Sequence, residues 1–116
     1  MKTASDPRHQ KRISLVQEIF AVGFDKAQIN DDVKNIVNNL DKIDKLIIQS
    51  APEWPLDKIA KIDLATLRVA LYELTVEKKE PTKVIIDEAV EIAKEFGNPN
   101  SAHFINGVLG TIIKLI

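Results

Sequence analysis

Three consecutive segments with helical periodicity, between residues 62 and 109, most strongly constrain how this 116-residue chain can fold. Asp63 can accept hydrogen bonds from the unpaired N–H groups at a helix start, so it is expected to cap the first segment. Pro81 opens the second segment. Gly97 ends it, because glycine enters a left-handed C-terminal cap at no steric cost. The turn Asn98-Pro99-Asn100-Ser101 then begins the third segment, so the pattern predicts three consecutive helices.

The first half of the chain carries two further helical patterns. Asp6 followed by Pro7 predicts an N-cap and the first position of a helix, and apolar residues then recur at three and four positions up to residue 24. Acceptors at residues 30–32 predict a second helix, whose buried stripe continues to residue 47. A short helical piece is expected at residues 56–61. No alternating strand pattern is evident, and short connections favour antiparallel neighbours, so we predict an all-α, compact antiparallel helical bundle.

The composition suits packed helices, since 45% of the residues are hydrophobic and only 5% are aromatic. The length predicts a single domain over residues 1–116. Without cysteine there are no disulfides, thiolate metal sites or cysteine nucleophile, and a reducing cytoplasm is the expected location. No apolar run approaches the roughly 20 residues that cross a bilayer. Gly107 and Gly110 lie inside the last helix, where each costs about 1 kcal/mol, so we expect a neighbouring helix to approach them closely.

Charge is distributed unevenly along the chain, although the net charge is only −1. Residues 1–12 carry +3, from Lys2, Arg8, Lys11 and Arg12 against Asp6, and the remaining residues carry −4. Cations near the start of a helix oppose its dipole, so stability does not explain their position. Four basic residues can attract phosphates, but they form a small patch, and on charge alone a solvated tail is the more frequent alternative.

The amino-acid sequences of the helical segments resemble the motifs of one protein family. The segments read IDLATLRVALYEL, PTKVIIDEAVEIAKEFG and NSAHFINGVL, in this order. They are similar to the phrases ID..ILR.A.YEL, P.KV.INEA.ELAK.FG and S..F.NGVL of NusB, the bacterial transcription antitermination factors. KRISLVQEIF at residues 11–20 also resembles the basic first helix of that family. The resemblance implies a NusB-like bundle that binds boxA-type RNA of ribosomal RNA leaders with the small-subunit ribosomal protein NusE, and that loads onto elongating RNA polymerase.

The same resemblance implies RNA contacts at two places. A basic cluster begins the first helix, although Gln10 interrupts it, and an amide-rich corner follows the fifth predicted helical segment. Helix caps and core packing are the alternatives for the corner residues. The residues for which RNA contact is predicted are Arg8, His9, Lys11, Arg12, Lys83, Phe96, Gly97, Asn100, Ser101 and Phe104.

A protein partner is expected at three other residues. By resemblance Phe20, Asp57 and Asp63 receive the basic ribosomal protein, while N-capping by Asp63 and a core position for Phe20 are the alternatives. Phe24 and Trp54 could instead support a homodimer. The stretch between residues 23 and 32 is shorter than in the family, which affects the expected ribosomal-protein interface more than the RNA surface.

Enzyme chemistry is not expected. His9 and His103 lack a companion histidine at metal-ligand spacing, and Ser101 is not in a glycine-flanked nucleophile turn. Glu88, Glu91 and Glu95 are predicted to form a solvated helix face. No metal or other cofactor is implied. Two rival functions remain: a helical protein adaptor that has lost RNA binding, and the RNA-binding domain of a ribosomal RNA cytosine methyltransferase, which would require the sequence to be a fragment of a longer protein.

Overall fold

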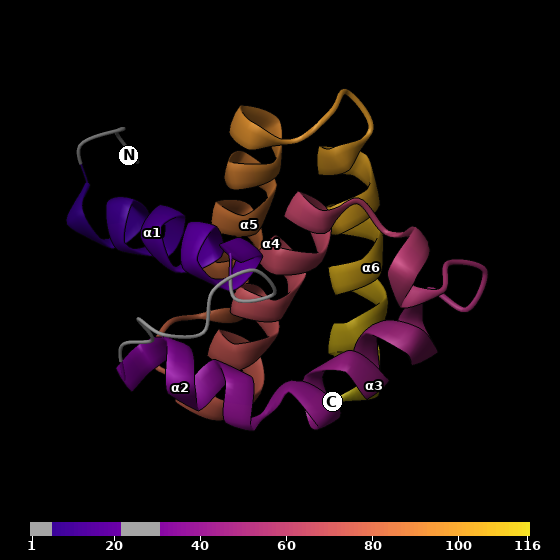
Figure 1. Cartoon of the computed structure of the whole chain (residues 1–116), viewed down its shortest axis with the longest axis horizontal. Helices are drawn as coiled ribbons and strands as arrows, with labels where there is room; N and C mark the ends of the chain where they lie inside the picture. The colour runs from indigo at the N-terminus through magenta and orange to yellow at the C-terminus, as the bar shows by residue number, and fades with distance from the viewer. Residues whose placement is uncertain (1–5, 22–30) are drawn as a thin grey trace.

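The computed structural model describes residues 6–21 and 31–116, and every regular element in these ranges is helical (Figure 1). Residues 23, 24 and 30, for which the sequence suggested roles, lie outside the described residues. The elements are α1 (Pro7–Ala21), α2 (Asp31–Asn38), α3 (Leu40–Ser50), the 3₁₀ turn η1 (Leu56–Lys58), α4 (Lys61–Tyr72), the π-helical turn η2 (Glu73–Glu77), α5 (Thr82–Phe96) and α6 (Ser101–Leu115).

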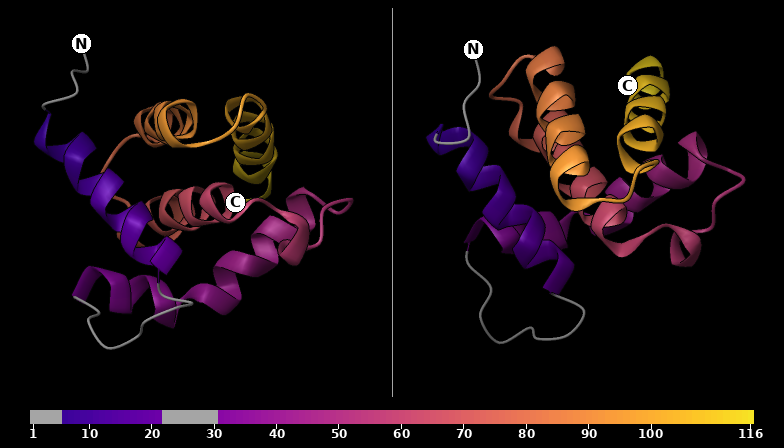
Figure 2. Two further views of the ribbon diagram at one scale, coloured as in Figure 1. Left: turned by 45° about the horizontal axis from the view of Figure 1, so that its top comes forward. Right: turned by 90° about the horizontal axis from the view of Figure 1, so that it is seen from above.

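Helix α4 occupies the centre of the molecule (Figure 2). The antiparallel pair α5 and α6 covers one side of it, α2 and α3 lie on the other side, and α1 crosses one edge. The sequence of α4 explains this position, because its apolar residues point in nearly every direction and a helix of that kind must be surrounded. Ala65, Leu67, Val69, Ala70 and Leu71 are all buried. The predicted all-α antiparallel bundle is therefore confirmed.

The predicted stripes of the outer helices also face this core. Ile36 and Ile43 are fully buried under α2 and α3, and Ile105, Leu109 and Ile112 are fully buried under α6. The pattern predicted one helix across residues 31–47, whereas the structure breaks it at Asn39, whose side-chain amide donates to the carbonyl oxygen of Asn35 at 2.7 Å. An asparagine that bonds to the backbone competes with helix continuation. The break lets the two halves follow the curved surface of the core (Figure 1).

The predicted start of α1 is confirmed. Pro7 is the first helical residue, and the backbone N–H of Arg8 donates to Asp6 Oδ1 at 2.8 Å. The prediction for α4 is wrong, because the helix begins at Lys61 after Ala60, and Asp63 makes no capping hydrogen bond. The expected close approach at Gly107 and Gly110 is also wrong, since a Cβ atom at either position would meet nothing within 4 Å. Within the described ranges, no helix is long and apolar enough to span a membrane.

Candidate nucleic-acid interface

The corner between α5 and α6 is organised by its own polar groups. The backbone N–H of Asn98 donates to Ser101 Oγ at 2.9 Å, and the N–H of Asn100 donates to Asn98 Oδ1 at 2.8 Å. The N–H of Ser101 completes the turn by donating to the Asn98 carbonyl oxygen at 3.0 Å. Ser101 is 1% exposed, so its hydroxyl shapes the corner from inside. Asn98 and Asn100 are exposed and present their amide groups to solvent beside the start of α6.

Gly97 is required at this corner for space and not for its backbone conformation. Its φ of −91° and ψ of −171° describe extended backbone, so the predicted left-handed cap is wrong. A Cβ atom at this position would lie 2.7 Å from the Ala93 carbonyl oxygen and closer still to the Ser101 side chain. The glycine therefore allows α6 to begin directly against the end of α5, which holds the corner in place.

Aromatic side chains lie on both sides of the corner. Phe96, the last residue of α5, is 39% exposed, so the core position considered for it is wrong. Phe104 lies in the first turn of α6 and is partly buried against the core. Its ring packs edge to face against Trp54, with centroids 6.1 Å apart and an angle of 74° between the ring planes. The corner thus combines exposed amides with aromatic surface, which are the two features that unpaired bases bind.

Two of the four predicted cations of α1 are accessible. Arg8 Nη1 lies 3.4 Å from Glu80 Oε1, and Lys11 Nζ lies 3.7 Å from Asp32 Oδ2. Both cations are exposed, and exposed ion pairs of this kind contribute at most about 1 kcal/mol, so a phosphate could replace the carboxylates. Arg8 and Lys11 also line a groove of about 120 Å³, whose other wall includes Lys79 and the carboxylates of Glu73, Glu77 and Glu80.

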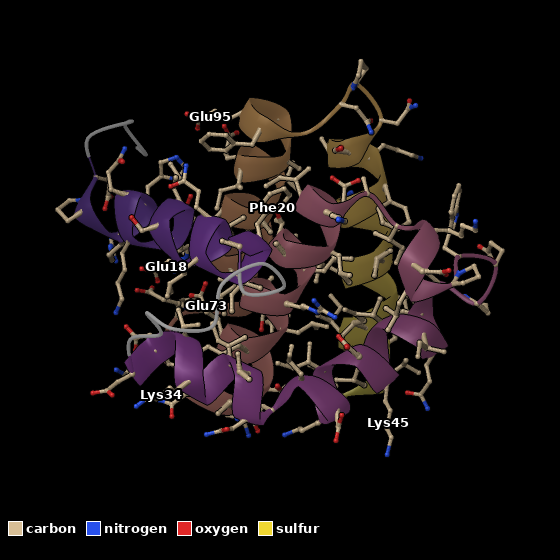
Figure 3. All side chains as sticks on the ribbon, viewed as in Figure 1. Glu18, Phe20, Lys34, Lys45, Glu73 and Glu95 are labelled. Carbon is tan, nitrogen blue, oxygen red and sulfur yellow. The ribbon has the colours of Figure 1, made fainter. Side chains whose placement is uncertain are left out.

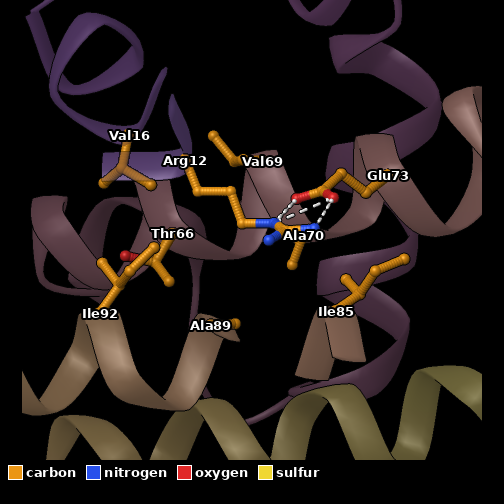
Figure 4. A pocket seen from close by; sticks show the side chains of 9 residues that line it. All are labelled: Arg12, Val16, Thr66, Val69, Ala70, Glu73, Ile85, Ala89 and Ile92. Atoms are coloured by element: carbon orange, nitrogen blue, oxygen red, sulfur yellow. Dashed lines mark hydrogen bonds and ion pairs between the residues drawn. The ribbon is translucent and has the colours of Figure 1, made fainter. Parts of the chain in front are cut away.

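The other two cations are buried and paired. Arg12 Nη2 donates to Glu73 Oε1 at 2.9 Å, and its Nε donates to Glu73 Oε2 at 2.9 Å (Figure 4). Its Nη1 donates to Glu88 Oε1 at 3.2 Å. His9 Nδ1 is hydrogen-bonded to Glu88 Oε2 at 2.8 Å. His9 and Arg12 are only 6% and 7% exposed. They join α1 to η2 and α5, so neither side chain is accessible to a phosphate.

Burial and pairing shift the titration of these groups. Burial alone would lower the pKa of Arg12, but the hydrogen bonds and charge of Glu73 hold it above its ordinary value, so the guanidinium stays protonated. Burial raises the pKa of Glu73, and Arg12 opposes this shift. At the helix start, the N–H donated by Arg8 lowers the pKa of Asp6. The solvated face predicted for α5 is wrong at Glu88, which is 3% exposed, although Glu91 and Glu95 are exposed.

The start of α1 reaches the end of α5 through the buried His9, whereas the accessible Arg8 lies beside Glu80, close to the other end of α5. His9 Nε2 lies 3.7 Å from Glu95 Oε2, and Glu95 immediately precedes Phe96. Figure 3 places Glu95 at the upper end of α5, near the start of α1. Lys83 is exposed at the other end of α5, 13 residues before Phe96 in the chain, which is roughly 20 Å along a helix. RNA contact by Lys83 would thus require a strand that follows the full length of α5.

The three residues predicted for a protein partner differ in accessibility. Phe20 is 41% exposed, so the alternative core position is wrong, and Asp57 is exposed in η1. Asp63 is 5% exposed, and its Oδ1 has no hydrogen-bond partner among the described residues. Phe20 and Asp57 can therefore meet a partner directly, whereas Asp63 cannot do so in this conformation. No three metal-ligating side chains cluster within residues 6–21 and 31–116.

Comparison with known proteins gives a consistent result along the chain. Residues 6–114 match the model of the NusB family. The transcription antitermination protein NusB of Herpetosiphon aurantiacus is 37% identical over 136 residues, covering 97% of this chain and 93% of that protein. The NusB of Acetivibrio thermocellus is 42% identical over 115 residues, covering 99% and 79%. With the NusB of Chloroflexus aggregans, identity is 49% over 73 residues, and the chain spans about half the length of that relative.

Solved structures show the same fold. The structure of T. maritima NusB superimposes with a TM-score of 0.83 at 33% identity, covering 98% of this chain and 93% of that one. A complex of the antitermination factors NusB and NusE with double-stranded RNA contains a chain that matches with a TM-score of 0.78 at 20% identity, covering 96% of this chain and all of that one. At this lower identity the second match concerns the fold alone.

Proposed function

The chain belongs to the NusB family, and we propose that it is a transcription antitermination factor that binds boxA-type RNA of ribosomal RNA leader transcripts. The match over residues 6–114 is the observation that carries this proposal. The activity is one of binding and positioning and not of catalysis. We place it in the cytoplasm, where the factor would join elongating RNA polymerase and help ribosomal RNA operons to escape premature termination.

The RNA surface that we propose consists of Arg8 and Lys11 in α1 together with Phe96, Asn100 and Phe104 at the corner. The two cations attract phosphates and release counterions, which favours any RNA sequence equally. The N–H groups at the start of α6 favour a phosphate as well. Bases that leave the stack can pack on the phenylalanine rings, while the exposed Asn100 amide can bond to base edges. In this arrangement α1 attracts the phosphates of the RNA, and the corner recognises its bases.

A protein partner completes the proposed function. A NusB chain of the same fold has been solved together with NusE and RNA, which supports the small-subunit ribosomal protein NusE as the partner. Asp57 offers an exposed carboxylate to a basic protein, and Phe20 offers an exposed ring. If the two ligands also contact each other on adjoining surfaces of the bundle, each strengthens the binding of the other by the same factor. The role of the chain is then to deliver RNA and protein to the polymerase as one unit.

A helical protein adaptor without RNA affinity is the second candidate function. The burial of His9 and Arg12 favours it, because the basic cluster is reduced to two accessible cations that already have carboxylate neighbours. The two functions differ in their RNA affinity and in how that affinity depends on salt. An antitermination factor that binds RNA through phosphates must bind more weakly as the salt concentration rises, whereas the adaptor does not bind RNA.

Titration of a fluorescently labelled boxA RNA tests the proposal. Two phosphate contacts on a single strand predict an affinity that falls about sevenfold between roughly 50 mM and 200 mM salt. Replacement of both Arg8 and Lys11 by alanine should weaken binding at low salt and remove most of this dependence. The matched control is Lys45→Ala, which removes an exposed lysine of α3 that lies far from both proposed elements (Figure 3). No binding, or binding that does not weaken as the salt concentration rises, would favour the adaptor.

A further inference from the structure

Trp54 is a large aromatic side chain that the protein holds in place while leaving half of it in solvent. Trp54 lies in the turn between α3 and η1 and is 49% exposed, and its backbone N–H donates to the carbonyl oxygen of the buried Ala51 at 2.9 Å. Pro52 and Pro55 on either side restrict the backbone of this turn. About half of the Trp54 side chain is therefore open to a ligand.

The packing of Trp54 places it next to the corner of the proposed RNA surface. Its ring meets Phe104 edge to face, at 6.1 Å between centroids, and Phe104 is linked to the corner because its N–H donates to the Asn100 carbonyl oxygen at 3.0 Å. An edge-to-face contact fixes the orientation of the two rings and occupies only part of the surface of each. Some of the Trp54 surface therefore remains free for a third aromatic group.

We infer that Trp54 is a stacking platform for an unpaired base of bound RNA, continuing the proposed surface from the corner across Phe104. This inference rests on the proposed RNA-binding function and adds a contact to it. Every base has an aromatic face, so a platform of this kind binds without a strong sequence preference. An indole that is already oriented loses little conformational freedom when a base stacks on it. The RNA would then run from α1 across the corner to the turn at residues 51–55.

The charges around Trp54 distinguish this contact from those of α1. Glu53 and Asp57 contribute negative charge close to the ring in the sequence, and Lys58 and Lys61 contribute positive charge. These charges balance, so the contact at Trp54 depends on stacking and hardly on phosphate attraction. Loss of the indole should therefore lower the affinity for RNA by a similar factor at low and high salt, whereas loss of Arg8 and Lys11 should alter the salt dependence.

The experiment uses the fact that Trp54 is the only tryptophan in the chain. Intrinsic fluorescence of the full chain is followed while boxA RNA is added, and the anisotropy of a labelled copy of the same RNA measures binding independently. We expect the fluorescence change to follow the binding curve. Trp54→Ala should weaken RNA binding roughly five- to hundredfold without changing the salt dependence, and Trp54→Phe should restore part of the affinity. Urea unfolding of both variants shows whether the fold is intact.

Each other outcome has a definite meaning. If labelled RNA binds while the fluorescence stays constant and Trp54→Ala binds as tightly as the wild type, the inference is wrong and the proposed function stands. If no RNA binds under any condition, both are wrong. If the fluorescence responds to the ribosomal protein alone, or to protein concentration alone, Trp54 belongs to an interface with that protein or with a second copy of the chain, and the stacking role is rejected.

Discussion

Gly97 and Gly107 show how the same residue type serves different purposes in one structure. A Cβ atom at residue 97 would collide with the Ala93 carbonyl oxygen and the Ser101 side chain, whereas one at residue 107 would enter open space. We predict that Gly97→Ala lowers the free energy of unfolding by about 1–3 kcal/mol. Gly107→Ala should raise it by up to about 1 kcal/mol, because alanine is the better helix former. Urea denaturation measures both changes, and equal effects would contradict this account.

Asp6 gives a prediction about pH. The N–H of Arg8 lowers the pKa of the Asp6 carboxyl in the folded protein, so the unfolded chain binds this proton more readily. The stabilisation by Asp6 is therefore present above the unfolded pKa and is lost as the pH falls through the folded pKa. Asp6→Asn keeps an acceptor for the helix cap but cannot titrate. We expect wild type and variant to differ most near neutral pH and to converge in acid, as followed by thermal unfolding; a gap that widens in acid would be inconsistent.

At the scale of elements, the buried pair Arg12 and Glu73 fastens α1 to the end of α4. Removal of one partner leaves a buried charge without compensation, so Arg12→Ala should lower the free energy of unfolding by about 3–5 kcal/mol. Arg8→Ala is the matched control, because Arg8 is exposed and its ion pairs contribute at most about 1 kcal/mol. Replacing both Arg12 and Glu73 by methionine should recover only part of the loss, because the buried Glu88 still loses its hydrogen bond from Arg12. Similar denaturation midpoints for Arg12→Ala and Arg8→Ala would show that the buried pair does not hold α1.

The elements were predicted well where the signal is local. Asp6, Pro7 and Pro81 indicated where α1 and α5 begin, because caps and prolines act on their immediate neighbours. The burial of Arg12 was not predicted, since its partner Glu73 is 61 residues away in the chain and Glu88 is 76 residues away. The sequence positions of these two glutamates did not indicate burial, because a charged residue at helical spacing is equally compatible with a solvated face and with a buried ion pair. The corner was predicted as a polar turn, while the close packing that requires Gly97 was visible only in the structure.

At the scale of the whole molecule, the partner surface makes a separate prediction. Asp57 is exposed whereas Asp63 is buried, so reversal of the charge at Asp57 should affect a basic partner directly. We expect Asp57→Lys to weaken binding of the ribosomal protein NusE about tenfold, mainly through slower association. Asp41→Lys, at an exposed position of α3, serves as the control. Calorimetric titration of each variant provides the affinity, and an unchanged value for Asp57→Lys would remove η1 from the interface.

The three helical segments between residues 62 and 109 were sufficient to predict the bundle, because their sequences indicate both the helices and the short connections between them. They were less informative about the RNA surface, since burial selects which cations remain accessible. Of the predicted basic cluster, Arg8 and Lys11 are exposed and His9 and Arg12 are buried. Trp54 was noted only as a possible self-association residue, and its position in a proline-bounded turn outside every helical stripe was the signal for a surface role.

Chemical-shift mapping of the ¹⁵N-labelled protein with boxA RNA tests most directly whether the start of α1 and the corner after α5 form one RNA-binding surface. The account predicts that amide shifts change at residues 8–11 and 96–104 in the same titration and with the same apparent dissociation constant, while residues 40–47 of α3 remain unaffected. Shift changes confined to α2 and α3, or changes in α1 without any at the corner, would contradict it.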